Sequence, residues 1–170
     1  MATLKIAGVV GDSITDGPGV RTAVFVQGCP HRCEGCHNPQ THDFAAGELI
    51  DTGELLAKIK RNPLLSGVTF TGGEPFCQAA ALAELGEGIK ALGLELAAYT
   101  GYTWEELLRE NDPERMRLLS LLDVLIDGRF VLAERSLELK FKGSRNQRTI
   151  DVQKSLRAGE VVSESSERWS

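Results

Sequence analysis

Residues 20–29 read VRTAVFVQGC, and this stretch is the best single guide to the fold. Residues 20–26 are short, rich in β-branched side chains and largely apolar on both faces, which is typical of a strand buried inside a parallel sheet. Cys29 lies just beyond the end of this strand. Ligands of parallel α/β sheets gather beyond the carboxyl ends of the strands, so we expect the functional site to begin there.

Strand and helix patterns alternate along the rest of the chain. Further strands are predicted at residues 67–70, 94–100 and 124–130, with two weaker candidates at 137–143 and 148–152. Helices are predicted at residues 52–61, 82–92, 104–110 and 114–122. This alternation predicts βαβ units and a mostly parallel sheet with helices outside. A complete eight-unit barrel takes about 250 residues, so a chain of 170 residues predicts a single-domain α/β fold, an incomplete TIM-like barrel. The domain is expected to span residues 1–160, and the polar residues 161–170 are expected to fray.

Composition narrows the function classes. The 42% apolar and 25% charged residues are ordinary for a globular protein. A net charge of -5 argues against a protein that holds a nucleic-acid backbone by bulk electrostatics. No stretch reaches the roughly 20 apolar residues of a membrane span, and no secretion signal is visible, so we expect no membrane and a cytoplasmic location.

Three of the four cysteines, Cys29, Cys33 and Cys36, fall within eight positions. In a reducing compartment such a cluster indicates a metal site before a disulfide framework. Iron–sulfur cubes are normally held by four thiolates, so a loop with three would leave one iron open to another ligand. The alternative is a zinc site that is closed by His31, His37 or Cys77.

A second motif, Gly72-Gly73-Glu74, follows the predicted strand at 67–70. Glycines let a bound ligand approach the backbone closely, since they lack a Cβ atom. Glu74 adds a carboxylate that accepts hydrogen bonds from an ammonium group. The alternative is an ordinary turn between strand and helix.

Together, the run Cys29-Pro-His-Arg-Cys33-Glu-Gly-Cys36 and the run Thr71-Gly72-Gly73-Glu74-Pro75 resemble the radical S-adenosylmethionine (SAM) superfamily. The flanking runs DGPGVR (16–21), QGC (27–29) and CHNP (36–39) resemble the glycyl-radical activating enzymes. The runs YTGYTWEEL (99–107), VLIDGRF (124–130) and GSRNQRTIDVQKSL (143–156) resemble the activating component of the anaerobic (class III) ribonucleoside-triphosphate reductase.

The resemblance implies that Cys29, Cys33 and Cys36 bind a [4Fe–4S] cluster and form the catalytic centre. It implies that Gly72, Gly73 and Glu74 meet the methionine end of SAM. A reduced cluster would then pass one electron to SAM, giving methionine and a 5′-deoxyadenosyl radical that takes a hydrogen atom from a glycine of the reductase. Thr100 and Asp127, each near a strand end, are weaker candidates for contacts with SAM.

Four further residues are candidates for contact with the substrate protein. Arg21 lies in the DGPGVR segment and is a candidate to grip the glycine loop, with a salt-bridged arginine after a turn as the alternative. Arg145, Asn146 and Arg148 suit a partner surface or the SAM carboxylate, with a solvated loop as the alternative. Gly35 stands where the superfamily often has an aromatic residue, which leaves the adenine contacts unassigned. Cys77 is expected to be a small packing residue.

The implied partners are the anaerobic reductase, as protein substrate, and a low-potential electron donor such as reduced flavodoxin or ferredoxin. Two other functions stay open from the sequence. One is activation of a different glycyl-radical enzyme, of the pyruvate formate-lyase type. The other is a non-catalytic adaptor that uses the same cysteines to bind zinc.

Overall fold

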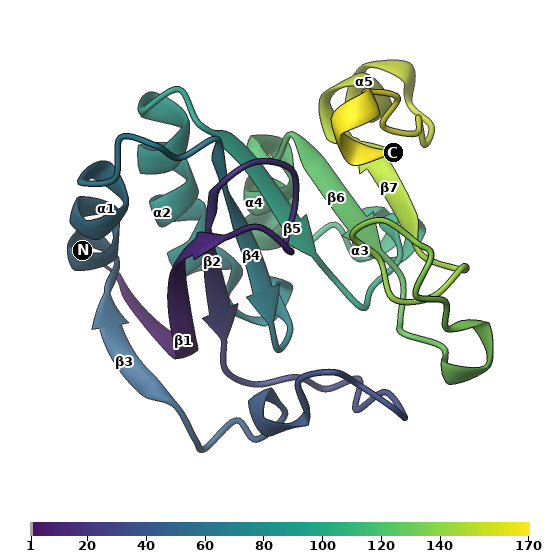
Figure 1. Cartoon of the computed structure of the whole chain (residues 1–170), viewed down its shortest axis with the longest axis horizontal. Coiled ribbons are helices and arrows are strands. Elements are labelled where there is room, and N and C mark those ends of the chain that lie inside the picture. The colour runs from purple at the N-terminus through teal and green to yellow at the C-terminus, as the bar shows by residue number, and fades with distance from the viewer. Residues whose placement is uncertain (1) are drawn as a thin grey trace.

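The computed structural model describes residues 2–170 and centres on one seven-stranded sheet (Figure 1). The strand order is β3-β1-β2-β4-β5-β6-β7, so β3 and β7 are the two edges. The strands are Thr3–Ser13 (β1), Arg21–Val26 (β2), Glu48–Asp51 (β3), Gly67–Gly72 (β4), Glu95–Tyr99 (β5), Val124–Asp127 (β6) and Arg148–Asp151 (β7). The central strands β2, β4, β5 and β6 run parallel, whereas β1, β3 and β7 pair antiparallel with their neighbours.

This architecture confirms the predicted open α/β fold, with differences at its edges. The antiparallel strands β1 and β3 were not predicted. In β1, two glycines and two register shifts against β2 interrupt the alternation that marks a strand. The weak candidate at residues 148–152 is confirmed as β7, but the candidate at 137–143 is wrong. That segment turns at Phe141, whose φ is 62°, and β7 already occupies the free edge of β6.

Helices cover one face of the sheet. They are Thr52–Lys60 (α1), Ala79–Ala91 (α2), Trp104–Glu110 (α3), Pro113–Leu121 (α4) and Val152–Ala158 (α5). Asp51, directly before the predicted helix, caps α1 by accepting a hydrogen bond from the backbone N–H of Glu54 at 3.1 Å. The large hydrophobic core lies between the helices and the sheet, and Phe70, Leu82 and Leu96 are fully buried in it. Among residues 2–170, no helix is both long and apolar enough to cross a bilayer.

The chain's last residues pack on the opposite face of the sheet. The expectation that residues 161–170 fray is therefore wrong. Trp169 is only 3% exposed and forms a second, smaller cluster with Ala97, Val124 and Ile126. Ser163 forms a bridge with Ile150 of β7, which fixes the approach of the tail. Burial of a large aromatic side chain and pairing with β7 together hold this short polar segment in place.

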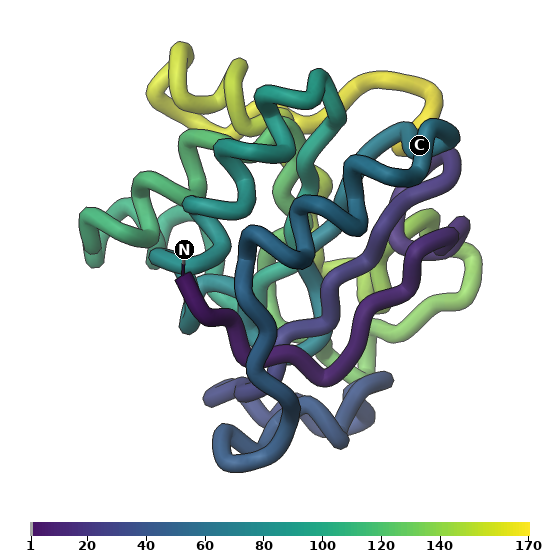
Figure 2. Tube along the Cα trace, turned by 90° about the vertical axis from the view of Figure 1, so that its left-hand side faces the viewer, coloured from purple at the N-terminus to yellow at the C-terminus, as the bar shows by residue number. Residues whose placement is uncertain are grey.

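Different segments of the chain cover the two ends of the parallel strands. Trp169 contacts the starts of β2 and β5 through Arg21 and Glu95. At the other end, the carboxyl ends of the parallel strands meet the long segment between β2 and β3 (Figures 1 and 2). This segment carries the three clustered cysteines.

Candidate functional site

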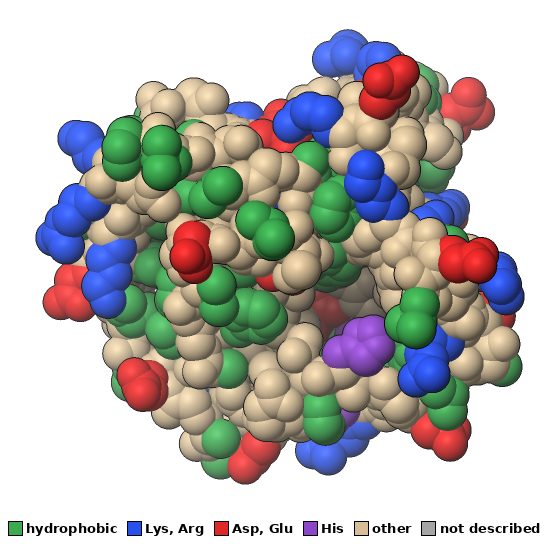
Figure 3. Space-filling view, in the orientation of Figure 1, with side chains coloured by type: hydrophobic (Ala, Val, Ile, Leu, Met, Phe, Trp, Pro, Cys, Tyr) green, Lys and Arg blue, Asp and Glu red, His purple; other side chains and the backbone are tan. Residues whose placement is uncertain are grey.

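A cavity of about 600 Å³ opens at the carboxyl ends of the parallel strands. Its volume is in the usual range of small-molecule sites, roughly 300–1,000 Å³. Figure 3 shows a hollow on the face of the molecule turned toward the viewer, with a histidine side chain at its rim. The predicted residues that line it are Cys29, Cys33, Cys36, Gly72, Gly73 and Thr100. The structure thus brings the two sequence motifs into one site, as predicted from the strand ends.

The cysteine loop is held at both of its ends. The N–H of Gly28 donates to the carbonyl of Thr41 at 2.7 Å, and the N–H of Cys29 donates to the carbonyl of His42 at 3.2 Å. Gly28 has a φ of 104°, a conformation that favours glycine. Cys29 is buried, whereas Cys33 and Cys36 are half-buried. The loop therefore presents three thiols to the cavity from a fixed base.

The three thiols line one cavity but do not converge on a single point. In residues 2–170, no three His, Cys, Asp or Glu side chains are gathered closely enough to hold one metal ion. Each thiolate of an iron–sulfur cube binds its own iron, so such a cluster does not need the sulfurs to converge on one point. Burial raises the pKa of the Cys29 thiol, while the backbone N–H groups of His31 and Arg32 act in the opposite direction. Iron binding would supply the positive charge that favours the thiolate.

The glycine turn is tied directly to the cysteine loop. The N–H of Gly73 donates to the carbonyl of Val26, and the N–H of Glu74 donates to the carbonyl of Gly28, both at 2.8 Å. A Cβ atom on Gly73 would lie 2.4 Å from the Gly28 carbonyl oxygen. The Gly73 position therefore requires glycine, because a side chain would push the two motifs apart.

Gly73→Ala is expected to weaken binding of SAM, the ligand that the sequence resemblance implies, by about tenfold or more, since the added methyl group displaces the base of the cysteine loop. Equilibrium dialysis against the oxidised protein, which cannot cleave SAM, measures the change. Gly11→Ala is the matched control, because nothing lies within 4 Å of its added Cβ. Equal affinities for the two variants would contradict the close approach described here.

Glu74 is buried beneath the cavity wall and is only 1% exposed. Its carboxylate accepts hydrogen bonds from four groups. The donors are His31 Nε2 (2.7 Å), the Gly101 N–H (2.7 Å), the Phe76 N–H (3.0 Å) and the Thr100 hydroxyl (2.9 Å). Glu74 thereby joins the cysteine loop, the glycine turn and the end of β5. His31, which the sequence indicated only as a candidate ligand of the zinc alternative, is a principal member of this network.

Asp127 does not reach the cavity, although it ends β6. Its carboxylate accepts from the Trp104 N–H at 2.8 Å and from Arg148 Nε at 3.0 Å. Alternation along β6 directs Asp127 to the helical side of the sheet, where it fixes the start of α3. Gly128, the residue after Asp127, lines the cavity instead.

Arg21 is fully buried, which does not suit contact with another protein. Its guanidinium pairs with Glu95 at 2.9 Å and donates to Thr69 Oγ1 (2.9 Å) and to the carbonyl of Pro18 (3.0 Å). The indole ring of Trp169 lies 5.4 Å from the guanidinium carbon. The structure thus favours the alternative of a salt-bridged arginine with a structural role.

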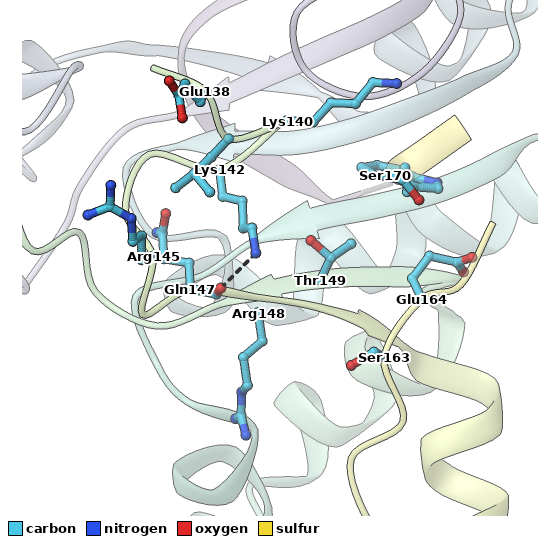
Figure 4. Close-up of a pocket in the computed structure, with 12 residues that line it drawn as sticks. Glu138, Lys140, Lys142, Arg145, Gln147, Arg148, Thr149, Ser163, Glu164 and Ser170 are labelled. Atoms are coloured by element: carbon cyan, nitrogen blue, oxygen red, sulfur yellow. Dashed lines mark hydrogen bonds between the residues drawn. The ribbon is translucent and has the colours of Figure 1, made fainter. Parts of the chain in front are cut away.

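A second, larger cavity of about 830 Å³ lies beside the first (Figure 4). Arg145 and Arg148 contribute to its lining, but the guanidinium groups of both point away from its centre. Arg148 pairs instead with Asp127 and Glu105. Lys142 is directed inward and donates to the carbonyl of Gln147 at 3.3 Å. This cavity holds no cysteine and no glycine turn, so we place the functional site in the smaller one.

Asn146 lies on the exposed turn before β7. Its amide donates to the carbonyl of Arg129 at 2.8 Å, and its oxygen accepts from the Ser144 hydroxyl at 2.6 Å. These bonds hold the turn itself. The structure does not bring Arg145, Asn146 and Arg148 together at the cysteines.

Aromatic side chains in the cavity wall were missed from the sequence. They are Tyr99, Phe130 and Phe141. The last two lie in the segment between β6 and β7, which has little regular structure, so no periodicity marked them. Gly35 has a φ of 78°, and an added Cβ would lie 2.8 Å from Leu132, so this segment already fills the space beside it. Cys77 is half-buried in a short 3-10 helix and outside the cavity lining.

Comparison with known proteins agrees with this site. Residues 15–150 match a family model described as a 4Fe-4S single cluster domain. The chain is 33% identical to the anaerobic ribonucleoside-triphosphate reductase-activating protein of Vibrio cholerae, over 79% of this chain and 89% of that one. It is 34% identical to the protein of the same name from Enterobacteria phage T4, over 78% and 85%. It is 39% identical to the pyruvate formate-lyase-activating enzyme of Clostridium pasteurianum, over 71% and 52%.

A three-thiol loop beside a glycine turn, at the open end of a parallel sheet, together with the matching 4Fe-4S model, indicates an iron–sulfur protein with a small-molecule cavity. The chain belongs to the family of radical SAM glycyl-radical activating enzymes. It is an oxidoreductase whose cofactors are a [4Fe–4S] cluster and SAM.

Proposed function

We propose that this enzyme activates the anaerobic ribonucleoside-triphosphate reductase by forming a radical on one of its glycines. The observation that carries the proposal is the single cavity shared by the cysteine loop and the glycine turn. The near full-length similarity to reductase-activating proteins supports the choice of substrate, since the match spans 89% of the Vibrio protein. The run GSRNQRTIDVQKSL, which supplies β7 and α5, supports the same choice.

Each part of the site has a separate task. Cys29, Cys33 and Cys36 would hold three irons and leave the fourth for the amino and carboxylate groups of SAM. A reduced cluster held there would supply one electron for the cleavage of SAM to methionine and a 5′-deoxyadenosyl radical, and that radical would take the hydrogen atom of the glycine. Gly72 and Gly73 would let the methionine end lie against the backbone, and Glu74 would accept from its ammonium group. Thr100 stands beside Glu74 and would border the same end of SAM.

The protein therefore contributes placement more than acid or base chemistry, because the reactive electrons belong to the cofactors. The aromatic rings of Tyr99 and Phe130 would offer adenine the apolar surface that Gly35 does not provide. We further propose that a low-potential protein such as reduced flavodoxin or ferredoxin donates the electron. A cytoplasmic location would keep the cysteines reduced for cluster binding.

Electron paramagnetic resonance tests the proposal directly. The reconstituted enzyme, SAM, a reductant and the anaerobic reductase are expected to give a glycyl radical signal on the reductase. Pyruvate formate-lyase is the parallel substrate, because its activator is also a relative. A signal from the lyase and none from the reductase would reassign the substrate. Zinc without sulfide in the anaerobically purified protein would favour the adaptor alternative instead.

A further inference from the structure

We propose that His31 is a displaceable cap on Glu74, and that the ammonium group of SAM takes its place when SAM binds. The inference rests on the proposed function, because it assumes that SAM binds at the glycine turn. It assigns a positioning role to a residue within the cysteine loop that does not itself bind iron.

The hydrogen-bonding capacity of Glu74 is the first reason. A carboxylate has about four lone-pair sites. Four groups, His31, Thr100 and the backbone N–H groups of Phe76 and Gly101, already donate to it. An incoming ammonium group therefore finds no free acceptor on Glu74. One of the present donors has to leave.

The layering of the wall is the second reason. His31, Thr100 and Gly101 all line the cavity, but Glu74 is not among the lining residues. The carboxylate is 1% exposed and lies behind its donors. A ligand in the cavity meets the His31 imidazole before it meets the carboxylate. Direct contact between SAM and Glu74 requires the wall to open.

His31 is the donor that is able to move. The N–H groups of Phe76 and Gly101 belong to the backbone, and Thr100 directly follows β5. His31 lies in the irregular segment between β2 and β3, where Arg32 has a φ of 47° and Gly35 a φ of 78°. Outside Glu74, its ring packs against Gly101, where an added Cβ would lie 2.3 Å from the imidazole, and has an edge-on contact with Tyr102, with the ring centres 4.6 Å apart. Release of the imidazole thus breaks one hydrogen bond and its packing on Gly101 and Tyr102, and it breaks no hydrogen bond between strands.

The cap has a consequence for ligand selection. A ligand with an amino group replaces the lost hydrogen bond, whereas an adenosine fragment without an amino acid does not. Displacing His31 therefore reduces the apparent affinity for SAM by the fraction of chains in the uncapped state. Methylthioadenosine has no amino group that could bond to Glu74, so it binds without displacing His31. Its affinity is therefore independent of the cap.

His31→Ala tests the cap in the cluster-loaded, oxidised protein, which binds SAM without cleaving it. The dissociation constant for SAM is expected to fall by about 3- to 10-fold, and that for methylthioadenosine to stay constant. His31→Gln is the matched control, because its amide is able to donate to Glu74, and its affinity for SAM is expected to stay near that of the original chain. Iron and sulfide content is measured alongside. Unchanged or weaker SAM binding by a fully loaded His31→Ala protein would overturn the proposal.

Chemical labelling of the original chain decides the question even where His31→Ala loses its cluster. Diethyl pyrocarbonate modifies accessible imidazoles, and the His31 side chain is only 5% exposed. Its modification, mapped by mass spectrometry against His37 and His42, is expected to rise when SAM is added and not when methylthioadenosine is added. Labelling of His31 that does not rise with SAM contradicts displacement. A protein that binds no SAM at all refutes the proposed function instead, so the two failures are distinguishable.

Discussion

Cys29→Ala, Cys33→Ala and Cys36→Ala are each expected to abolish reductive cleavage of SAM. Each cysteine holds a different corner of the cluster, and the loop offers no spare thiol at the cavity. The loaded wild-type chain should contain about four iron atoms, whereas each variant should lose intact cluster. Iron and sulfide analysis, the visible spectrum and the yield of 5′-deoxyadenosine measure the effect.

Cys77→Ala is the matched control for these variants. Cys77 is half-buried and lies outside the cavity that the three clustered thiols line, so it is not placed to bind the same cluster. The variant is expected to keep both its cluster and most of its activity. A Cys77→Ala protein without cluster would mean that the ligand set has been assigned wrongly.

Glu95→Gln is expected to cause the largest loss of stability. The substitution leaves the fully buried Arg21 guanidinium without its partner carboxylate. Removal of one member of a buried ion pair costs about 3–5 kcal/mol, which corresponds to a fall in Tm of roughly 6–20 °C for a domain of this size. Anaerobic scanning calorimetry or circular dichroism measures the shift.

Arg168→Ala separates this effect from simple loss of a surface charge. Arg168 also pairs with Glu95, at 2.8 Å, but its side chain is 56% exposed. An exposed pair contributes less than about 1 kcal/mol, so its removal should change Tm little. Similar shifts for Glu95→Gln and Arg168→Ala would contradict the dominant role of the buried partner.

The Glu95 carboxylate also makes the stability of the fold depend on pH. Burial by itself would raise the pKa of Glu95, but the Arg21 and Arg168 guanidiniums outweigh it and hold the pKa below the ordinary value of 4.5. A group with a lowered pKa stabilises the fold above its unfolded pKa, and this contribution is lost as the pH falls through the folded pKa. The Tm difference between the wild type and Glu95→Gln is therefore expected to be complete at pH 7 and to shrink below about pH 4.5.

The sequence predicted the central strands and the meeting of two motifs because both depend on local patterns. The apolar run at residues 20–26 and the capping residue Asp51 need no tertiary information. The antiparallel strand β1 was missed because its glycines and bulges hide its alternation. The alternating run at 137–143 was misread as a strand because alternation does not show whether a neighbouring strand is free to pair.

The site residues also divide into those that a local pattern reveals and those that only tertiary contacts reveal. The cysteines and the glycine turn were found by spacing, whereas His31 and the aromatic wall depend on how distant segments fold together. Asp127 was predicted at the correct strand end but on the wrong face of the sheet. Its side chain belongs to β6, so the alternation along that strand directs it to the helical side and away from the cavity. Arg21 showed no sign of burial in the sequence, since its partner Glu95 is 74 residues away.

The half-buried state of Cys33 and Cys36 has a practical consequence. The cavity of about 600 Å³ that these thiols line is open to solvent, so it also admits dioxygen. Exposure to air would strip the iron and leave these thiols open to sulfenic acid formation and further oxidation. Preparations handled outside a glove box should therefore be colourless, and Cys33 and Cys36 should carry oxidative damage before the more deeply buried Cys29 does.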